Sequence, residues 1–135
     1  MGSRTPKPRR TEDLETVFAN PLVNVDPCTC TSAQTAAMQL QTISQRIAPE
    51  NEWDDRQQGI LMALSLLKGS SVILNEVDLT ILVNGISAAL TDARSALVKV
   101  AAMYVAAGSQ TLQRSFTSSA DVLLKPLFSQ LNNGT

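Results

Sequence analysis

Apolar residues recur at spacings of three and four along most of the chain, which is the period of helices that bury one side. In the first such segment, residues 31–47, the apolar positions are Ala33, Ala36, Ala37, Leu40, Ile43 and Ile47. Thr31 or Ser32 can cap this helix, and Pro49 follows it. No convincing alternating run indicates a strand, so the pattern predicts an all-α protein.

A second helix is predicted between an acidic start and Gly69. Its apolar positions are Trp53, Ile60, Leu61, Leu64 and Leu67. Asp54 and Asp55 suit the first turn and Lys68 the last, because the helix dipole favours acids at its start and bases at its end. Gly69 suits the position after the helix. Residues 70–74 are predicted to be a turn or one further helical turn.

The longest predicted element spans residues 75–107, as one Ala-rich helix or as two helices almost end to end. Asn75 can cap its start, Thr91-Asp92 can cap a second helix after a break near Leu90, and Gly108 can end it. A narrow polar stripe runs along it, formed by Thr80, Asn84, Ser87, Thr91, Arg94 and Ser95. The other sides are mostly apolar and need cover from several directions, for which a short chain has little material. The pattern therefore predicts a protein that assembles with other subunits.

The remaining segments divide the chain into two parts. Residues 1–30 are predicted to form an N-terminal arm, a short helix over residues 11–18 and an extended connection that crosses a neighbouring subunit. Residues 31–135 are predicted to form the helical domain. Its end contains a short helix over residues 109–117 and a last helix from Ser118 that Pro126 kinks or breaks.

Charge is distributed unevenly, although the net charge is only −1. Residues 1–10 contain Arg4, Lys7, Arg9 and Arg10 and no acid, whereas the rest of the chain has seven bases and twelve acids. A basic arm on an acidic body indicates binding to a polyanion or self-association. Arm and body bases give the candidate phosphate contacts Arg4, Lys7, Arg9, Arg10, Arg46, Arg56 and Arg94, with Lys99 and Arg114 as further body bases. Few aromatic residues argue against stacking on single strands.

Catalytic and metal-binding patterns are missing from the sequence. It has no histidine, no phosphate-binding loop and no dinucleotide-binding motif, so we expect neither an enzyme nor a cofactor. The acids at positions 50–55 are explained by a helix start and predict no metal site. Cys28 and Cys30 are expected to be reduced thiols, with a disulfide to another subunit as the alternative. No apolar run is long enough to span a bilayer, and we expect a soluble protein made in a cytosol.

In outline the chain resembles the major capsid proteins of filamentous and rod-shaped archaeal viruses. The likeness is carried by the basic arm SRTPKPRR at residues 3–10, the connection ANPLV at 19–23, and the Ala-rich segments GISAAL at 85–90 and VAAMYVAAG at 100–108. The resemblance implies a helical fold whose dimers wrap linear double-stranded DNA, held in the A-form, inside a filament. It implies that Arg4, Lys7, Arg9 and Arg10 contact phosphates, with Arg46, Arg56 and Arg94 as weaker candidates.

The resemblance also implies the surroundings of the protein. Its partners would be copies of itself and, in some relatives, a paralogous capsid protein. Its location would be the virion, after synthesis in the host cytoplasm; a membrane envelope is compatible with the sequence but not indicated by it. Two alternatives remain open: a coat protein that binds single-stranded RNA in a flexuous or rod-shaped virus, and a non-viral helical interaction module.

Overall fold

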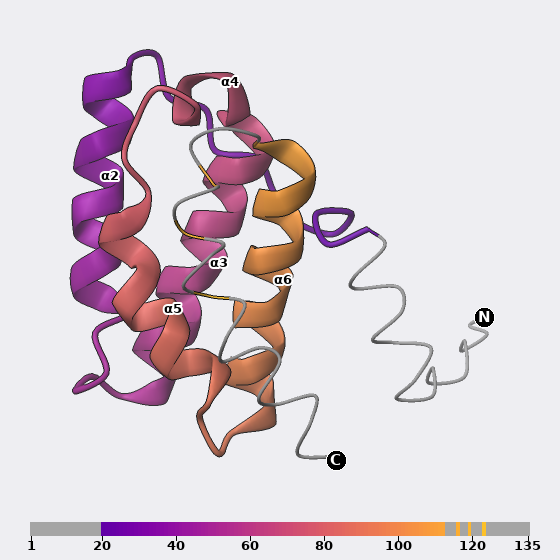
Figure 1. Ribbon diagram of the computed structural model, residues 1–135. Coiled ribbons are helices and arrows are strands. Elements are labelled where there is room, and N and C mark those ends of the chain that lie inside the picture. The colour runs from indigo at the N-terminus through magenta and orange to yellow at the C-terminus, as the bar shows by residue number, and fades with distance from the viewer. Residues whose placement is uncertain (1–19, 113–115, 117–118, 120–122, 124–135) are drawn as a thin grey trace, which may run out of the picture.

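The computed structural model describes residues 20–112 together with residues 116, 119 and 123 (Figure 1). The elements of the continuous part are α2 (Ala33–Arg46), α3 (Trp53–Gly69), α4 (Ser71–Leu74), the 3₁₀ turn η1 (Thr80–Leu82), α5 (Val83–Leu90) and α6 (Ser95–Thr111). Within these residues there is no strand, and the prediction of an all-α protein is confirmed.

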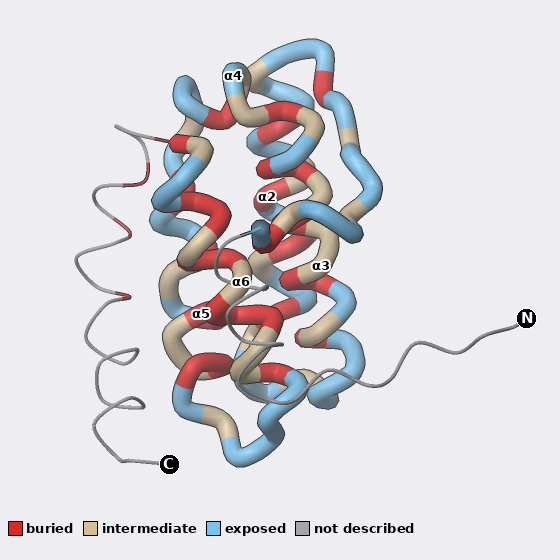
Figure 2. The backbone as a smooth tube through the Cα atoms, turned by 90° about the vertical axis from the view of Figure 1, so that its right-hand side faces the viewer, coloured by how far each residue is buried: buried red, intermediate tan, exposed pale blue. Residues whose placement is uncertain are grey.

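The four longer helices run alongside one another, and the chain passes alternately down and up the bundle (Figure 1). Helix α3 packs against both α2 and α6, α5 packs against α6, and α2 contacts η1. Buried positions of all four helices face inward between these neighbours (Figure 2). Leucine, isoleucine and alanine supply most of this core, so the helices approach closely.

Helices α2 and α3 lie where the sequence predicted them. The side chain of Ser32 caps α2 by accepting a hydrogen bond from Thr35 N at 3.1 Å. Ala37 was predicted to be apolar core but is exposed. Gly69 is the last residue of α3 rather than the residue after it, and Ser70 is the C-cap.

The segment 75–107 forms a helix pair, α5 and α6, as one of the two predicted forms, but the two helices pack side by side rather than end to end. Asn75 is the C-cap of α4, not the start of a long helix. Asp78 instead holds the turn before η1, since its Oδ1 accepts hydrogen bonds from Thr80 N at 3.0 Å and Thr80 Oγ1 at 2.6 Å. The predicted break at Leu90 is confirmed, and beyond it α6 turns back and packs against α5.

Because α6 packs against α5, the chain itself covers the apolar sides of the segment 75–107. Leu82, Ile86 and Leu90 are at most 1% exposed, although only residues of the same chain surround them. The polar stripe faces outward as predicted, with Thr80, Asn84, Thr91, Arg94 and Ser95 exposed and Ser87 half-buried. The apolar residues of this segment are therefore no evidence that the protein assembles with other subunits, and the prediction of assembly needs different evidence.

The connection before α2 packs against its own chain at Cys28 and Cys30, while the predicted crossing of a neighbouring subunit stays a prediction. Cys28 N donates to Ser65 O at 2.9 Å, and Cys30 N donates to Ser70 Oγ at 2.8 Å. Ser70 Oγ in turn donates to Cys28 O at 2.7 Å. Within the chain both cysteines are free thiols, Cys28 half-buried and Cys30 buried, and the alternative of a disulfide to another subunit stays a prediction.

The end of the described chain differs from the prediction. Helix α6 passes through Gly108 and ends at Thr111, and Leu112 is extended, so residues 109–112 do not start a separate helix. Tyr104 packs against Phe116 with ring centroids 5.7 Å apart. The predicted helix over residues 11–18 lies outside the described residues. So do residues 113–115 and 117 of the predicted helix over 109–117, and all of the predicted last helix from Ser118 except Ser119 and Leu123.

Candidate nucleic-acid interface

Three of the predicted phosphate contacts come together at one end of the bundle. Arg46 ends α2, Arg56 lies in the first turn of α3, and Arg94 precedes α6. Asp55 and Asp92 lie among them and form ion pairs with all three. The remaining candidates, Arg4, Lys7, Arg9 and Arg10, lie outside the described residues.

Arg56 is buried, with only 7% of its side chain exposed. Its Nη1 donates to Asp92 Oδ2 at 3.2 Å, and its Nε has no hydrogen-bond partner among the described residues. A guanidinium held in this way is directed into the protein, because moving it to a phosphate would break its hydrogen bond to Asp92 Oδ2. In the folded chain the Arg56 charge is directed toward Asp92 and away from the surface.

Asp92 is the centre of the cluster. Its Oδ1 accepts a hydrogen bond from Arg94 N at 2.8 Å and lies 3.9 Å from Arg94 Nη1, while Oδ2 faces Arg56. The backbone N–H of Arg94, followed by the Arg56 guanidinium, lowers the pKa of the Asp92 carboxyl below its ordinary value against the opposing effect of burial. The carboxylate is therefore ionised at neutral pH and holds the loop between α5 and α6 against α3.

Arg94 and Arg46 remain accessible at the edge of the cluster. The Arg94 guanidinium lies 5.8 Å from the centre of the Trp53 ring, in the range of a cation–π contact, and 56% of its side chain is exposed. Arg46 lies 4.0 Å from Asp55 and donates to the sulfur of Met62 at 3.4 Å, with 44% of its side chain exposed. Trp53, predicted to lie in the core, is 38% exposed and supports Arg94 instead.

The electrostatic balance of this end is acidic despite its three arginines. Five carboxylates lie in the segments that form it: Glu50, Glu52, Asp54, Asp55 and Asp92. Residues 20–112 as a whole contain five Lys or Arg and eight Asp or Glu. Residues 20–112 therefore carry a net negative charge, which disfavours their binding to a duplex, since a duplex has about one negative charge per 1.7 Å of its axis.

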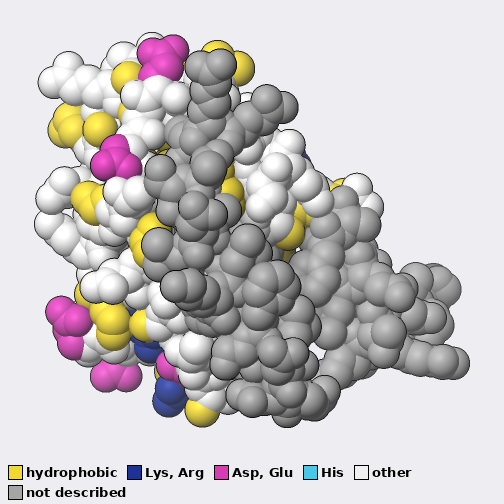
Figure 3. All heavy atoms as spheres, in the orientation of Figure 1, with side chains coloured by type: hydrophobic (Ala, Val, Ile, Leu, Met, Phe, Trp, Pro, Cys, Tyr) yellow, Lys and Arg dark blue, Asp and Glu magenta, His cyan; other side chains and the backbone are white. Residues whose placement is uncertain are grey.

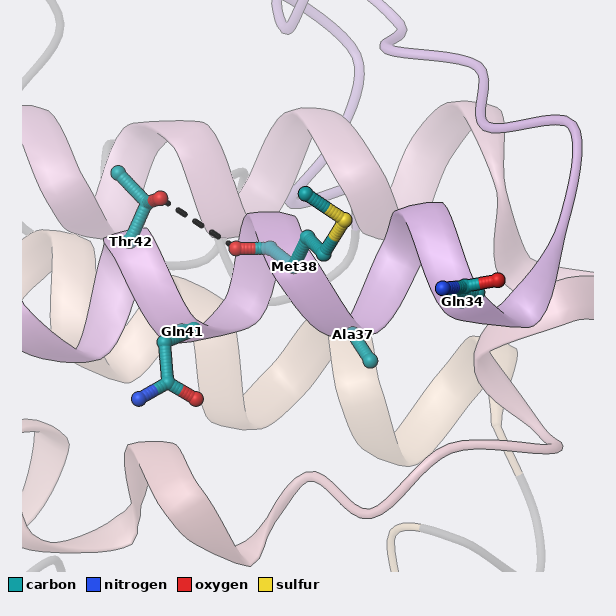
Figure 4. A pocket seen from close by; sticks show the side chains of 5 residues that line it. All are labelled: Gln34, Ala37, Met38, Gln41 and Thr42. Atoms are coloured by element: carbon teal, nitrogen blue, oxygen red, sulfur yellow. Dashed lines mark hydrogen bonds between the residues drawn. The ribbon is translucent and has the colours of Figure 1, made fainter.

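The outward side of α2 forms a second candidate surface of a different kind. We call it the α2 outer face, and it consists of Gln34, Ala37, Met38, Gln41, Thr42 and Gln45, all exposed. In the close view, Met38 and Thr42 lie along one edge of the helix and Ala37 and Gln41 along the other (Figure 4). The first five residues line a shallow hollow, and Thr42 Oγ1 donates to Met38 O at 3.3 Å.

No charged residue occurs in α2 before its last residue, Arg46. Met38 is 66% exposed, one of the most exposed large apolar side chains in the described chain. Depletion of charge and enrichment in methionine are typical of the centre of protein–protein interfaces. Sequence reasoning considered only the inward stripe of this helix and missed the outer face, although the absence of charge over residues 33–45 was a visible signal.

The described residues hold no group of three or more His, Cys, Asp or Glu side chains able to bind a metal ion. Among the helices described, none combines the length and the apolar character needed to cross a membrane. A scan of the chain against protein-family models and a search of curated proteins each found no match.

Proposed function

We propose that this protein is a structural subunit that assembles with copies of itself and binds linear double-stranded DNA through its N-terminal arm. In this role it is the coat protein of a filamentous virus and is located in the virion. The observation that carries the proposal is the separation of charge: four bases lie within residues 1–10, whereas residues 20–112 have an excess of acids. The resemblance to archaeal filamentous-virus capsid proteins supplies the duplex, in the A-form, as the polymer.

The separation of charge supports binding that does not depend on base sequence. Basic side chains neutralise phosphates and release condensed counterions, and this contribution to affinity is the same for any sequence. Arg4, Lys7, Arg9 and Arg10 supply four such contacts per subunit. Repetition of a small contact along a polymer makes a strong complex when neighbouring subunits also bind each other.

The cluster at the end of the bundle has a secondary role in this proposal. Arg94 and Arg46 are accessible and can add phosphate contacts at the edge of the body. Arg56 is not retained as a contact, because its charge is already used by Asp92.

Binding to duplex DNA at several salt concentrations tests the proposal. We expect the logarithm of the affinity per subunit to fall with the logarithm of the salt concentration with a slope of about −3.6, for four contacts at about −0.9 each. Replacing Arg4, Lys7, Arg9 and Arg10 by Gln should remove most of this slope. The matched control, Arg46→Gln with Arg94→Gln, should change it far less. A quadruple variant that binds as the wild type does would overturn the role of the arm.

A comparison of polymers and electron micrographs complete the test. Under the proposal, the protein and duplex DNA form filaments of regular diameter that protect the DNA from nuclease. Preference for single-stranded RNA would instead favour the flexuous-virus alternative. The uncharged α2 outer face favours a second candidate function, a helical interaction module, which predicts protein association but no binding to either nucleic acid at low salt.

A further inference from the structure

We infer that the α2 outer face is a contact between two copies of this chain, in which α2 of one subunit packs against α2 of the other. The inference deepens the proposed function and rests on it in one respect, that copies of the subunit meet. Four observations lead to a second copy as the occupant, and each concerns described residues.

The first observation is that α2 has two stripes, of which its own chain covers one. Ala36, Leu40 and Ile43 are at most 2% exposed and pack into the bundle. The opposite stripe, the α2 outer face, repeats at the same spacings of three and four and is exposed along its whole length. The exposed side of α2 is therefore long enough for a second helix to pack along it.

The second observation concerns charge. In a contact between identical copies related by a two-fold axis, each surface meets itself, so a charged surface meets like charges. The described body has an excess of acids, and in the view of Figure 3 acidic side chains lie toward the two ends of the bundle. Met38 is eight residues before Arg46, about 12 Å along the helix, which exceeds the screening length of about 8 Å at physiological salt. The centre of the α2 outer face around Met38 is therefore free of charge, and only its end at Gln45 adjoins the charged Arg46.

The third observation is that the side chains of this face are complementary to themselves. The amides of Gln34, Gln41 and Gln45 each both donate and accept hydrogen bonds, so the same side chains on two copies satisfy one another. A carboxylate or an ammonium group lacks this property, because it only accepts or only donates. Beside the glutamines, Met38 projects next to the small Ala37, which gives a protruding side chain and a hollow on the same face (Figure 4).

The fourth observation is that exposed uncharged side chains continue beyond α2 as far as the acid Asp78, which bonds to Thr80. Helix α2 contacts η1, where Thr80 and Ile81 are exposed and Ile81 is 41% exposed. Helix α2 alone, with 14 residues, is about 21 Å long, which gives a contact smaller than the standard interface of about 1,600 Å². We therefore expect weak self-association in dilute solution that repetition strengthens in a filament.

Charge variants at one position test the inference directly. Gln41→Glu and Gln41→Lys each place like charges on two meeting faces, and both new residues favour helix. Sedimentation equilibrium of the full chain, without nucleic acid and at up to millimolar concentration, should show each variant to associate at least ten-fold more weakly than the wild type. An equimolar mixture of the two should recover the association, because Glu on one copy then faces Lys on the other. Gln58→Glu and Gln58→Lys, at an exposed position of α3, form the matched control and should change nothing.

Three results would overturn the inference. These are wild-type protein that stays monomeric throughout this range, Gln41 variants that associate like the wild type, or a mixture that does not recover. Circular dichroism and thermal unfolding show whether a variant has kept its fold. Because these measurements contain no DNA, they fail independently of the arm: loss of DNA binding in the arm variant with intact self-association separates the two proposals.

Discussion

Arg56 donates a hydrogen bond from Nη1 to Asp92 Oδ2 across 3.2 Å, and the pair joins the first turn of α3 to the loop between α5 and α6. The side chains are only 7% and 16% exposed. Because both charges are largely removed from water, the Arg56 charge depends on Asp92 for compensation, while Asp92 is also compensated by Arg94. The pair is thus a structural link, although the arginine had the sequence features of a phosphate contact.

Removing one partner of this pair should destabilise the protein strongly. Asp92→Ala leaves the buried Arg56 guanidinium without its carboxylate and removes the acceptor for Arg94 N. We expect the free energy of unfolding to fall by about 3–5 kcal/mol, the usual cost of an uncompensated buried charge. Urea denaturation measures it. Arg94→Gln, which changes an exposed side chain of the same cluster, should cost less than about 1 kcal/mol; equal losses in the two variants would contradict this account.

The same pair predicts a dependence of stability on pH. The pKa of the Asp92 carboxyl is lower in the folded protein than in the unfolded chain, where it is about 3.9. A lowered pKa contributes stability that is complete well above this value and is lost as the pH falls through the folded-state pKa. Wild-type stability should therefore fall as the pH drops below about 5.

Comparison with Asp92→Asn isolates this contribution. The variant has no titrating group at position 92, so its stability should change less than that of the wild type over the same acid range. Denaturation midpoints measured at intervals between neutral pH and about pH 3 provide the comparison. Parallel curves for the two proteins would show that other carboxylates control acid unfolding.

The sequence was sufficient for the elements whose signals are local. Helix α2 begins at the capping side chain of Ser32 and α3 begins with an acidic first turn, and both bury regularly spaced apolar residues. In the segment 75–107, the position of the first helix was predicted wrongly. Asp78 accepts two hydrogen bonds from Thr80 and so forms the turn between α4 and η1, where the sequence indicated the first turn of a long helix. A short acidic residue suits both a first helical turn and a turn before a helix, and only the packing against α2 and α6 decides between them.

The candidate site depended on contacts between residues far apart in the chain. Arg56 belongs to a helix start rich in acids and has no local feature that distinguishes a buried arginine from an exposed one. Its burial depends on Asp92, which the α5–α6 turn brings within reach. Likewise, the position of Trp53 in the apolar period indicated core, whereas Arg94 covers its ring from outside the helix.

Ser70 holds the connection before α2, and its loss should release that segment. The hydroxyl accepts from Cys30 N and donates to Cys28 O, so Ser70→Ala leaves a donor and an acceptor without this partner. We expect a loss of about 1–3 kcal/mol. The local readouts are faster hydrogen exchange at the Cys30 amide and faster reaction of the Cys30 thiol with a thiol reagent. Ser65→Ala is the control, since the connection uses its backbone carbonyl and not its side chain.

Tyr104 carries a buried hydroxyl that has no hydrogen-bond partner among the described residues. Burial raises the pKa of Tyr104, because the phenolate is the form that loses solvation. Tyr104→Phe keeps the ring contact with Phe116 and removes the unpaired group, so it should leave stability unchanged or raise it by about 1 kcal/mol. Thermal unfolding measures this. A loss of more than about 1 kcal/mol would indicate a partner for the hydroxyl.

Ile47 lies between two glycines, Gly59 of α3 and Gly85 of α5, and alanine should be destabilising at each of them. A methyl group at Gly59 would lie 2.6 Å from Ile47 Cγ2, and one at Gly85 would meet the Ile47 side chain and lie 2.8 Å from its carbonyl oxygen. In an exposed helix, Gly→Ala raises the free energy of unfolding by about 1 kcal/mol. Here overpacking should instead lower it by about 1–3 kcal/mol.

Double-mutant cycles with Ile47→Ala distinguish the two glycines. Truncating Ile47 removes Cγ2, so it should relieve Gly59→Ala and give a favourable coupling energy. At Gly85 the backbone carbonyl of residue 47 stays in place, so relief should be smaller. Urea denaturation of the two single variants, Ile47→Ala and the two doubles gives both coupling energies. Coupling near zero in both cycles would mean that the helices separate to admit the methyl groups and that Ile47 does not set their spacing.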